Sequence, residues 1–400
     1  MNNYFYNMVD PDEMTTLEYI PTIPKFLEFI KKQYSDYPAI SDKVTTYTYE
    51  ELVSRVAKRV TFINSLGLEK GSNIAVLAKN DLDAMELFLA IPAAGHVLIM
   101  LPNALNDKAL AGISMKFDLA GMFVGKEFTE VTANLPCKTW SSTSIGETES
   151  TFADVEKDTT AAIFFTGGTT GAPKGAVHSH GSIMRGSFNG VFGPGSILHK
   201  RYIAMLPLSH IFGAIMGYMA KLYTGSLTYT CTDMRAGIGD IPVVRPTTLV
   251  LVPGLVEIIL NIAKLKGRAF LGDLELIMCG AAPVPPRQME ECRELGITLC
   301  AGYGLTECAN LTSGNCDTDK KPESMGHIYP EQHVKVVDGE LWIKGDNVMK
   351  EYYKDPEHTA EVLEDGWFKT GDLVEFDDND WIYITCLLYT SDAADDLIGV

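Results

Sequence analysis

FFTGGTTGAPKG, residues Phe164–Gly175, begins with the last two residues of a short apolar run and contains four glycines, three threonines and one lysine. The run Ala161–Phe165, AAIFF, predicts a buried strand, so the glycine-rich stretch is predicted to be the loop that follows it. Glycines let an anion approach backbone N–H groups closely, and the threonine hydroxyls and the lysine ammonium add further donors. The stretch therefore predicts a phosphate-binding loop, although a plain surface loop would have a similar composition. The candidate phosphate contacts are Thr166, Gly167, Gly168, Thr169, Thr170, Gly171 and Lys174.

Gly168 and Lys174 have the spacing of the P-loop pattern G-x-x-x-x-G-K-[ST], but two other positions depart from it. Pro173 occupies the position of the second glycine, and Gly175 replaces the Ser or Thr that would contact Mg²⁺. We therefore do not expect a P-loop NTPase, although the loop retains the donors that a phosphate needs.

The segments on both sides of the loop alternate between strand and helix patterns, which predicts an α/β fold with parallel sheets. Thr48 and Glu51 form a predicted capping box, Gly67 suits the end of the helix that follows, and another helix is expected near Ser179 or His180. The other predicted strands are Asn73–Ala78, Val97–Leu101, Thr248–Val252, Leu274–Cys279 and Leu299–Tyr303, and the other predicted helices are Asp81–Ala90, Leu255–Lys264 and Pro286–Leu295.

The composition excludes several classes of partner. The 400 residues carry a formal net charge of −19, which argues against a nucleic-acid groove or an anionic membrane surface, because both require a basic face. The most apolar stretch, Ala84–Leu101, contains Glu86 and Pro92, so a buried helix followed by a buried strand fits it better than a membrane span. The N-terminus has no signal-peptide pattern, and we expect a cytoplasmic protein.

Neither the cysteines nor the two neighbouring histidines have the spacing of a metal site. Cys292, Cys300, Cys308 and Cys316 recur every eight residues, but metal sites usually pair their ligands more closely, so we interpret the spacing as coincidence and expect reduced thiols. His178 and His180 form an H-x-H pair, and two ligands alone do not make a metal site.

Further motifs follow the loop in a fixed order. They are Pro207–Gly213 (PLSHIFG), Gly280–Pro283 (GAAP), Gly302–Glu307 (GYGLTE), Glu340–Gly345 (ELWIKG), Tyr353–Pro356 (YKDP) and Gly366–Asp372 (GWFKTGD). With these motifs the chain resembles the adenylate-forming (AMP-binding) superfamily, and within it the acyl-CoA synthetases or fatty-acid–CoA ligases, from about Pro38 to Thr385. The resemblance implies a large N-terminal adenylate-forming domain over residues 1–385, built from two α/β subdomains with parallel-rich sheets and a small β-barrel subdomain at about 326–385.

The reaction implied by this resemblance joins a carboxylic acid to ATP, with Mg²⁺, and then transfers the acyl group to coenzyme A. Lys174 would contact the β- and γ-phosphates, Thr306 the α-phosphate, Glu307 the Mg²⁺ ion, and His210 the substrate carboxylate. Asp372 would accept from the ribose hydroxyls, and Tyr303 would stack on adenine. The remaining residues implied at the nucleotide and acyl sites are Gly280, Ala281, Ala282, Gly302 and Gly304.

Each of the side chains with an implied role also has a structural interpretation. Glu307 could be a solvated carboxylate, Asp372 a turn residue and His210 a hydrogen-bonded core histidine. Two alternative functions also stay open, namely an enzyme that loads the thiol of a carrier protein and a nucleotide-binding or acyl-adenylate-binding module without turnover.

The acid is expected to be apolar. Relatives that activate amino acids usually carry an Asp soon after the second motif, whereas residues 211–215, IFGAI, contain no carboxylate. The apolar run Ile211–Met219 suits an aliphatic or aryl acyl group, and a fatty acid is the leading expectation.

The end of the sequence departs from the pattern of the superfamily. A Gly-Arg-x-Lys-Asp hinge and a small C-terminal domain would follow the last barrel strand, but after Thr385 the chain continues with CLLYTSDAADDLIGV. We expect Cys386–Val400 to be an aberrant tail derived from sequencing-adapter DNA, and a chain without the C-terminal domain to be impaired in thioester formation.

Overall fold

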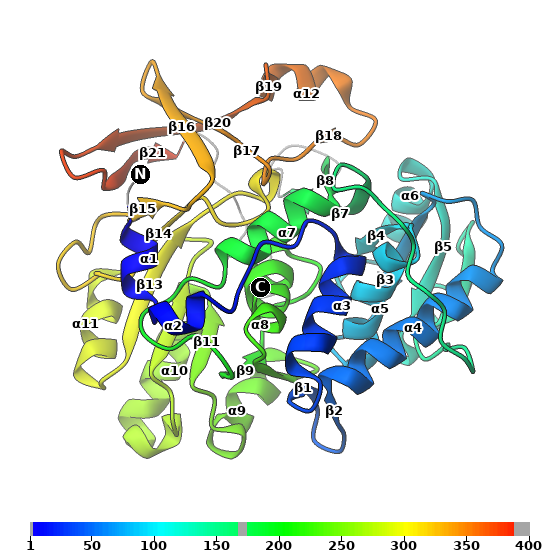
Figure 1. The fold of residues 1–400 in the computed structure, drawn as a ribbon, viewed down its shortest axis with the longest axis horizontal. Helices are drawn as coiled ribbons and strands as arrows, with labels where there is room; N and C mark the ends of the chain where they lie inside the picture. Colours follow the sequence, from blue (N-terminus) through cyan, green and yellow to red (C-terminus); the bar gives the residue numbers. More distant parts are fainter. Residues whose placement is uncertain (1–2, 167–173, 388–400) are drawn as a thin grey trace.

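A computed structural model describes residues 3–166 and 174–387. The predicted phosphate contacts Gly167, Gly168, Thr169, Thr170 and Gly171 lie outside the described residues, as does most of the predicted aberrant tail. Within the described ranges, strands form one seven-stranded sheet, two smaller mixed sheets and one antiparallel sheet. Figure 1 shows the antiparallel sheet, orange to red, above the two α/β halves, which lie side by side.

The first half is built on a seven-stranded sheet with the order β18-β8-β7-β4-β3-β5-β6. The central strands β7, β4, β3, β5 and β6 run parallel, whereas β8 turns back antiparallel to β7. Strands β7 and β8, which precede and follow the predicted glycine-rich loop in the sequence, are therefore antiparallel neighbours, and strand β8 was not predicted from the sequence. The bounds are β3 (Asn73–Leu77), β4 (Val97–Met100), β5 (Leu119–Val124), β6 (Lys138–Ser141), β7 (Thr160–Thr166), β8 (Lys174–Ser179) and β18 (Glu351–Tyr352).

Helices of this half confirm the main sequence predictions. The apolar stretch that begins at Ala84 forms most of one buried helix and then the buried strand β4. A helix also starts at His180, as predicted. None of the described helices is long and apolar enough to cross a membrane. The bounds are α3 (Ile23–Tyr34), α4 (Tyr49–Ser65), α5 (Leu82–Ala93), α6 (Asp107–Lys116) and α7 (His180–Asn189).

The start of α4 has the predicted capping box. The Thr48 hydroxyl accepts from the Glu51 backbone N–H at 3.2 Å, and the Glu51 carboxylate accepts from the Thr48 N–H at 2.8 Å. Two donors that would otherwise lack helical partners are thus satisfied.

Substituting Thr48→Ala is expected to destabilise the protein by about 1 kcal/mol, because the helix loses its N-terminal acceptor. Urea unfolding of the variant and of the exposed control Thr151→Ala would measure this. Equal midpoints for the two variants would contradict the proposed role of the cap.

The second half combines two smaller sheets. In one, β11, β12 and β13 run parallel, and β14 and β15 continue antiparallel. In the other, β1, β10 and β9 run parallel, with β2 antiparallel at the edge. The strand bounds are β1 (Pro38–Ser41), β2 (Thr46–Thr48), β9 (Arg201–Ala204), β10 (Leu227–Thr230), β11 (Thr248–Leu251), β12 (Leu276–Cys279), β13 (Thr298–Tyr303), β14 (Ser313–Asn315) and β15 (His327–Ile328).

The helical segments of the second half include an unusual one. A π-helix over the apolar residues that follow His210 continues directly into an α-helix, and such wide turns often occur at functional sites. The bounds are η2 (Phe212–Met219), α8 (Ala220–Tyr223), α9 (Met234–Val244), α10 (Pro253–Lys266), α11 (Pro286–Glu294) and η4 (Thr306–Cys308). The first two helices of the chain are α1 (Tyr4–Met8) and α2 (Pro11–Met14).

The predicted barrel region forms an antiparallel sheet with the order β16-β17-β20-β19, and β21 also pairs with β20. Among the described strands β16 pairs with β17 and with no second strand, so the sheet is open at this edge. The expectation of antiparallel strands is confirmed, and a closed barrel is not formed by the described strands. The bounds are β16 (Gln332–Val337), β17 (Glu340–Gly345), α12 (Pro356–Val362), β19 (Leu363–Glu364), β20 (Trp367–Phe376) and β21 (Ile382–Leu387).

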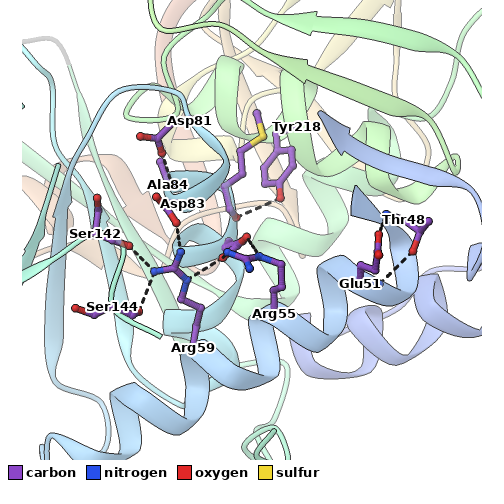
Figure 2. Close-up of polar contacts among 12 residues, drawn as sticks. Thr48, Glu51, Arg55, Arg59, Asp81, Asp83, Ala84, Ser142, Ser144 and Tyr218 are labelled. Atoms are coloured by element: carbon purple, nitrogen blue, oxygen red, sulfur yellow. Dashed lines mark hydrogen bonds and ion pairs between the residues drawn. The ribbon is translucent and has the colours of Figure 1, made fainter. Parts of the chain in front are cut away.

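The packing of α4 against α5 contains a buried ionic network (Figure 2). Arg59 of α4 is fully buried and donates to Glu86 at 2.8 Å, to Asp83, and to the backbone carbonyls of Ser142 and Ser144. Arg55 donates to the same Glu86 carboxylate, which has no exposed surface. The network thus explains why a glutamate stands within the apolar stretch.

The expectation that all cysteines are reduced is wrong for one pair. Cys300 and Cys316 form a disulfide, with their Cα atoms 4.2 Å apart. Strands β13 and β14 pair antiparallel with Ala301 opposite Asn315, so the next positions, 300 and 316, face each other across the two strands. Sequence spacing alone did not reveal this, because the pairing depends on the register between β13 and β14.

Candidate active site

One cavity of about 440 Å³ lies where the antiparallel sheet meets the two α/β halves. Its walls include residues from β8, η2, β12, β13, η4 and β20. The structure brings every predicted site residue that it describes to this cavity. These residues are Thr166, Lys174, His210, Gly280, Ala281, Ala282, Gly302, Tyr303, Gly304, Thr306, Glu307 and Asp372.

Lys174 and Glu307 both contact a third residue, Tyr352. The Tyr352 hydroxyl donates to Glu307 Oε1 at 2.7 Å, and Lys174 Nζ lies 5.3 Å from the centre of the Tyr352 ring. Burial raises the pKa of Glu307, while the Tyr352 hydrogen bond and the charge of Lys174 oppose that rise. The trio therefore holds a cation and a carboxylate at one end of the cavity, where a polyanion and a metal ion could both bind.

Tyr352 was not predicted as a site residue. It belongs to the short strand β18, which pairs with β8 in the register Tyr352 to Ala176. The backbone N–H groups of Lys350 and Tyr353 also donate to carbonyls of β8, each at 2.8 Å. The YKDP motif starts one residue later, at Tyr353. The sequence does not show that this motif lies beside strand β8, and for that reason Tyr352 was missed.

His178 supports the segment that carries Thr306 and Glu307. Its ring contacts the Thr306 carbonyl through Nε2 at 2.8 Å and Ser182 Oγ through Nδ1 at 3.1 Å. Burial lowers the pKa of His178 to about 4, so the ring is neutral at pH 7. His180 instead accepts from the Ile23 N–H at 3.3 Å. The two histidines of the H-x-H pair therefore make hydrogen bonds to different parts of the structure.

His210 lies two residues before the π-helix η2 and lines the cavity. Its Nδ1 accepts from the Phe212 N–H at 3.3 Å, which leaves the proton of a neutral ring on Nε2. Burial lowers the pKa of His210 to about 4. A neutral imidazole with an Nε2–H donor can orient a substrate carboxylate by hydrogen bonding, without supplying a full positive charge.

Asp372 and Tyr303 form a buried pair in the wall of the cavity. The Tyr303 hydroxyl donates to Asp372 Oδ2 at 2.5 Å, whereas Oδ1 is buried without a hydrogen-bond partner among the described residues. Burial raises the pKa of Asp372 to about 6, and the charges of Glu307 and Glu340 add to that rise. An orphaned carboxylate oxygen is an acceptor for a ligand hydroxyl. One oxygen of Asp372, rather than both, is therefore available to such a ligand.

The backbone beside this pair is tightly constrained. Ala281 has a φ of 67°, a conformation that costs a residue with a side chain about 1 kcal/mol or more. A Cβ on Gly304 would lie 1.2 Å from the Asn310 carbonyl oxygen, so only glycine fits at that position. The close approach of Gly304 to the Asn310 carbonyl therefore fixes the backbone of this wall.

The cavity offers few protein ligands for a metal ion. The described residues contain no group of three or more His, Cys, Asp or Glu side chains arranged to hold one. Mg²⁺ usually keeps several waters and binds one or two carboxylates together with phosphate oxygens. Glu307 fits this mode as a single protein ligand, since its carboxylate lines the cavity beside Lys174.

The chain is similar in sequence and in fold to several known proteins. Feruloyl-CoA synthase of an Amycolatopsis species is 27% identical over 362 residues, which cover 85% of this chain and 73% of the relative. The 2-succinylbenzoate–CoA ligase of Listeria monocytogenes is 26% identical over 343 residues, which cover 84% of this chain and 72% of the relative. The solved N-terminal domain of FACL13 from Mycobacterium tuberculosis aligns at 20% identity with a TM-score of 0.82, over 91% of this chain and 100% of that domain.

The structural alignment confirms the predicted fold, and the sequence matches confirm the predicted resemblance. The model of the family described as AMP-binding enzyme matches residues 27–353, most of the chain. This range includes the glycine-rich loop, His210 and the Thr306–Glu307 segment. The chain therefore belongs to the AMP-binding enzyme family.

Proposed function

We propose that this protein activates a carboxylic acid with ATP, forming an acyl-adenylate and pyrophosphate, and then transfers the acyl group to the thiol of coenzyme A. The observation that carries the proposal is one cavity with two different walls. Lys174, Glu307 and Asp372 supply charged groups for a nucleotide, while residues of η2 and β12 supply an apolar surface for an acyl group. The names of the relatives, which are CoA ligases, support the second half of the reaction.

The residues act mainly by positioning and by neutralising charge. In the adenylation step a carboxylate attacks the α-phosphate of a polyanion, so the repulsion between them must be reduced. Lys174 places a positive charge at the phosphate end, and Thr306 lies next to Glu307 on η4, where its hydroxyl can contact the α-phosphate. When bound, Mg²⁺ at Glu307 would neutralise phosphate charge. His210 would orient the carboxylate through Nε2–H.

The acyl group is proposed to be apolar next to the reacting carboxylate. Phe212 and Met216 of η2 and Met278 of β12 line the cavity, and residues 211–215 offer no carboxylate for a substrate ammonium group. This supports the expectation of an aliphatic or aryl acid over an amino acid. A fatty acid is one member of that class, and the relatives include an aryl ligase.

ATP–pyrophosphate exchange with a panel of carboxylic acids tests the first step. Acid-dependent exchange, followed by thioester formation when coenzyme A is added, is the expected result. Exchange with acyl transfer only to a carrier protein would support the alternative thiol acceptor. Binding of ATP without exchange for any acid would contradict the proposed enzyme and support a binding module.

Nucleotide binding is expected to depend on the charge of Asp372. Its pKa of about 6 means that the carboxylate is ionised above that pH and protonated below it. Affinity for adenosine, which has no phosphate to titrate near pH 6, should therefore rise as the pH increases through 6 and level off above about 7, because the ionised oxygen is the better acceptor. In Asp372→Asn this step should disappear and the affinity at pH 7.5 should fall about 10-fold. Calorimetric titration of adenosine at several pH values would measure both effects, and a step that persists in the variant would contradict the assignment.

A further inference from the structure

A second, smaller cavity adjoins the main one. It has a volume of about 20 Å³, enough for a single water molecule. Met216 of η2 and Met278 of β12 line both cavities and thus form the boundary between them. Methionine is unbranched and adapts its shape readily, so a boundary of two methionine side chains can open by rotamer changes.

Lys221 of α8 lines the small cavity and is 3% exposed. Its ammonium nitrogen lies 4.4 Å from the centre of the Tyr202 ring, a cation–π contact. Among the described residues no carboxylate forms an ion pair with Lys221, and no acidic side chain lines the small cavity. Burial alone accounts for the lowering of the pKa of Lys221 to about 7. A buried ammonium without an anionic partner is costly, and one is seldom kept unless something pairs with it.

The two threonine hydroxyls that line the small cavity already have partners. Thr224 donates to the Lys221 carbonyl at 3.1 Å, and Thr248 hydrogen-bonds to Tyr202. Lys200 also lines it, but this lysine is partly exposed and already lies 3.9 Å from Glu275. Lys221 is therefore the better-placed charge for a ligand that enters from the main cavity.

We propose that Lys221 binds a second carboxylate at the far end of the acid, so that the preferred substrate is a dicarboxylic acid with an apolar middle section. The reacting carboxylate would lie at His210, the apolar section along Phe212 and Met216, and the distal carboxylate beyond the two methionines. The inference rests on the proposed adenylation at the main cavity and narrows its substrate class. A plain fatty acid would leave the Lys221 charge unpaired.

Two families of non-hydrolysable acyl-adenylate analogues test the proposal. Both are 5′-O-(N-acylsulfamoyl)adenosines over a series of chain lengths, one ending in a methyl group and the other in a carboxylate. At the best chain length the carboxylate analogue should bind about 10- to 100-fold more tightly, as for a buried charge-assisted hydrogen bond. Isothermal titration calorimetry of the full chain measures this without requiring turnover.

Two variants then show which lysine causes the preference for the carboxylate analogue. Lys221→Met should remove the preference for the carboxylate analogue and leave binding of the methyl analogue unchanged or tighter. Lys200→Met, from the same cavity, should keep the preference. A preference that Lys200→Met rather than Lys221→Met abolishes would overturn the assignment.

The wild-type protein alone decides the substrate class even where a variant fails to fold. Equal or tighter binding of the methyl analogues at every chain length would overturn the dicarboxylate proposal while leaving adenylation intact. Failure of both families to bind would instead contradict the proposed function.

Discussion

Adenylation by Glu307→Gln is expected to be about 10²- to 10³-fold slower than by the unaltered chain. Glutamine has nearly the same shape and can still accept from the Tyr352 hydroxyl, which lies 2.7 Å from Glu307 Oε1. It lacks the negative charge that a magnesium ligand needs beside Lys174. The loss should therefore appear in the rate of ATP–pyrophosphate exchange, and the Mg²⁺ concentration for half-maximal exchange should rise.

A matched control comes from the same cavity. Glu361 of α12 also lines it but is exposed, and Glu361→Gln is expected to change the exchange rate less than twofold. If Glu307→Gln kept its rate and its Mg²⁺ requirement, Glu307 would be a structural partner of Tyr352 only. Equal losses in the two variants would show that the cavity responds to total charge rather than to Glu307.

The largest expected effect on stability comes from the buried network between α4 and α5. Glu86→Gln should lower the free energy of unfolding by about 3–5 kcal/mol, because Arg59 stays buried after losing its main charged partner. Glu86 has no exposed surface and receives hydrogen bonds from both Arg55 and Arg59, while Asp83 remains partly exposed. Urea unfolding would measure the change as a lower midpoint at an unchanged slope.

Glu50→Gln, at the start of α4, is the control for this stability prediction. Glu50 lies 3.8 Å from Lys31 at the surface, and its loss should change the free energy of unfolding by less than about 1 kcal/mol. A loss below about 1 kcal/mol for Glu86→Gln would mean that the two arginines reach water or another acceptor when the charge is removed.

Much of the fold could be predicted from local patterns. The capping box at Thr48, the strand at Asn73 and the helix at His180 follow from short-range chemistry that the sequence displays directly. The strand β8 could not be predicted, because a hairpin return after a glycine-rich loop has no periodic pattern of its own. The Cys300–Cys316 bond could not be predicted either, since it depends on the register between β13 and β14.

The residues of the candidate site also fall into a predicted group and a missed group. Residues that belong to motifs, such as Lys174, Glu307 and Asp372, were predicted and line one cavity. Tyr352, His178 and Lys221 were missed as contributors, because their roles come from partners distant in sequence. A lysine within an apolar stretch is a visible signal, but its meaning depends on which cavity its ammonium group faces.

Because the chain is synthesised from its N-terminus, strand β8 is made long before its partner β18. Strands β3 to β7 are complete once residue 166 has left the ribosome, but the outer neighbour of β8 is not made until Tyr352. During translation of the whole second half, β8, which begins at Lys174, is therefore an unprotected sheet edge. A nascent chain that stalls in this interval would expose a template for strand addition, and we expect it to depend on chaperones until Tyr352 emerges.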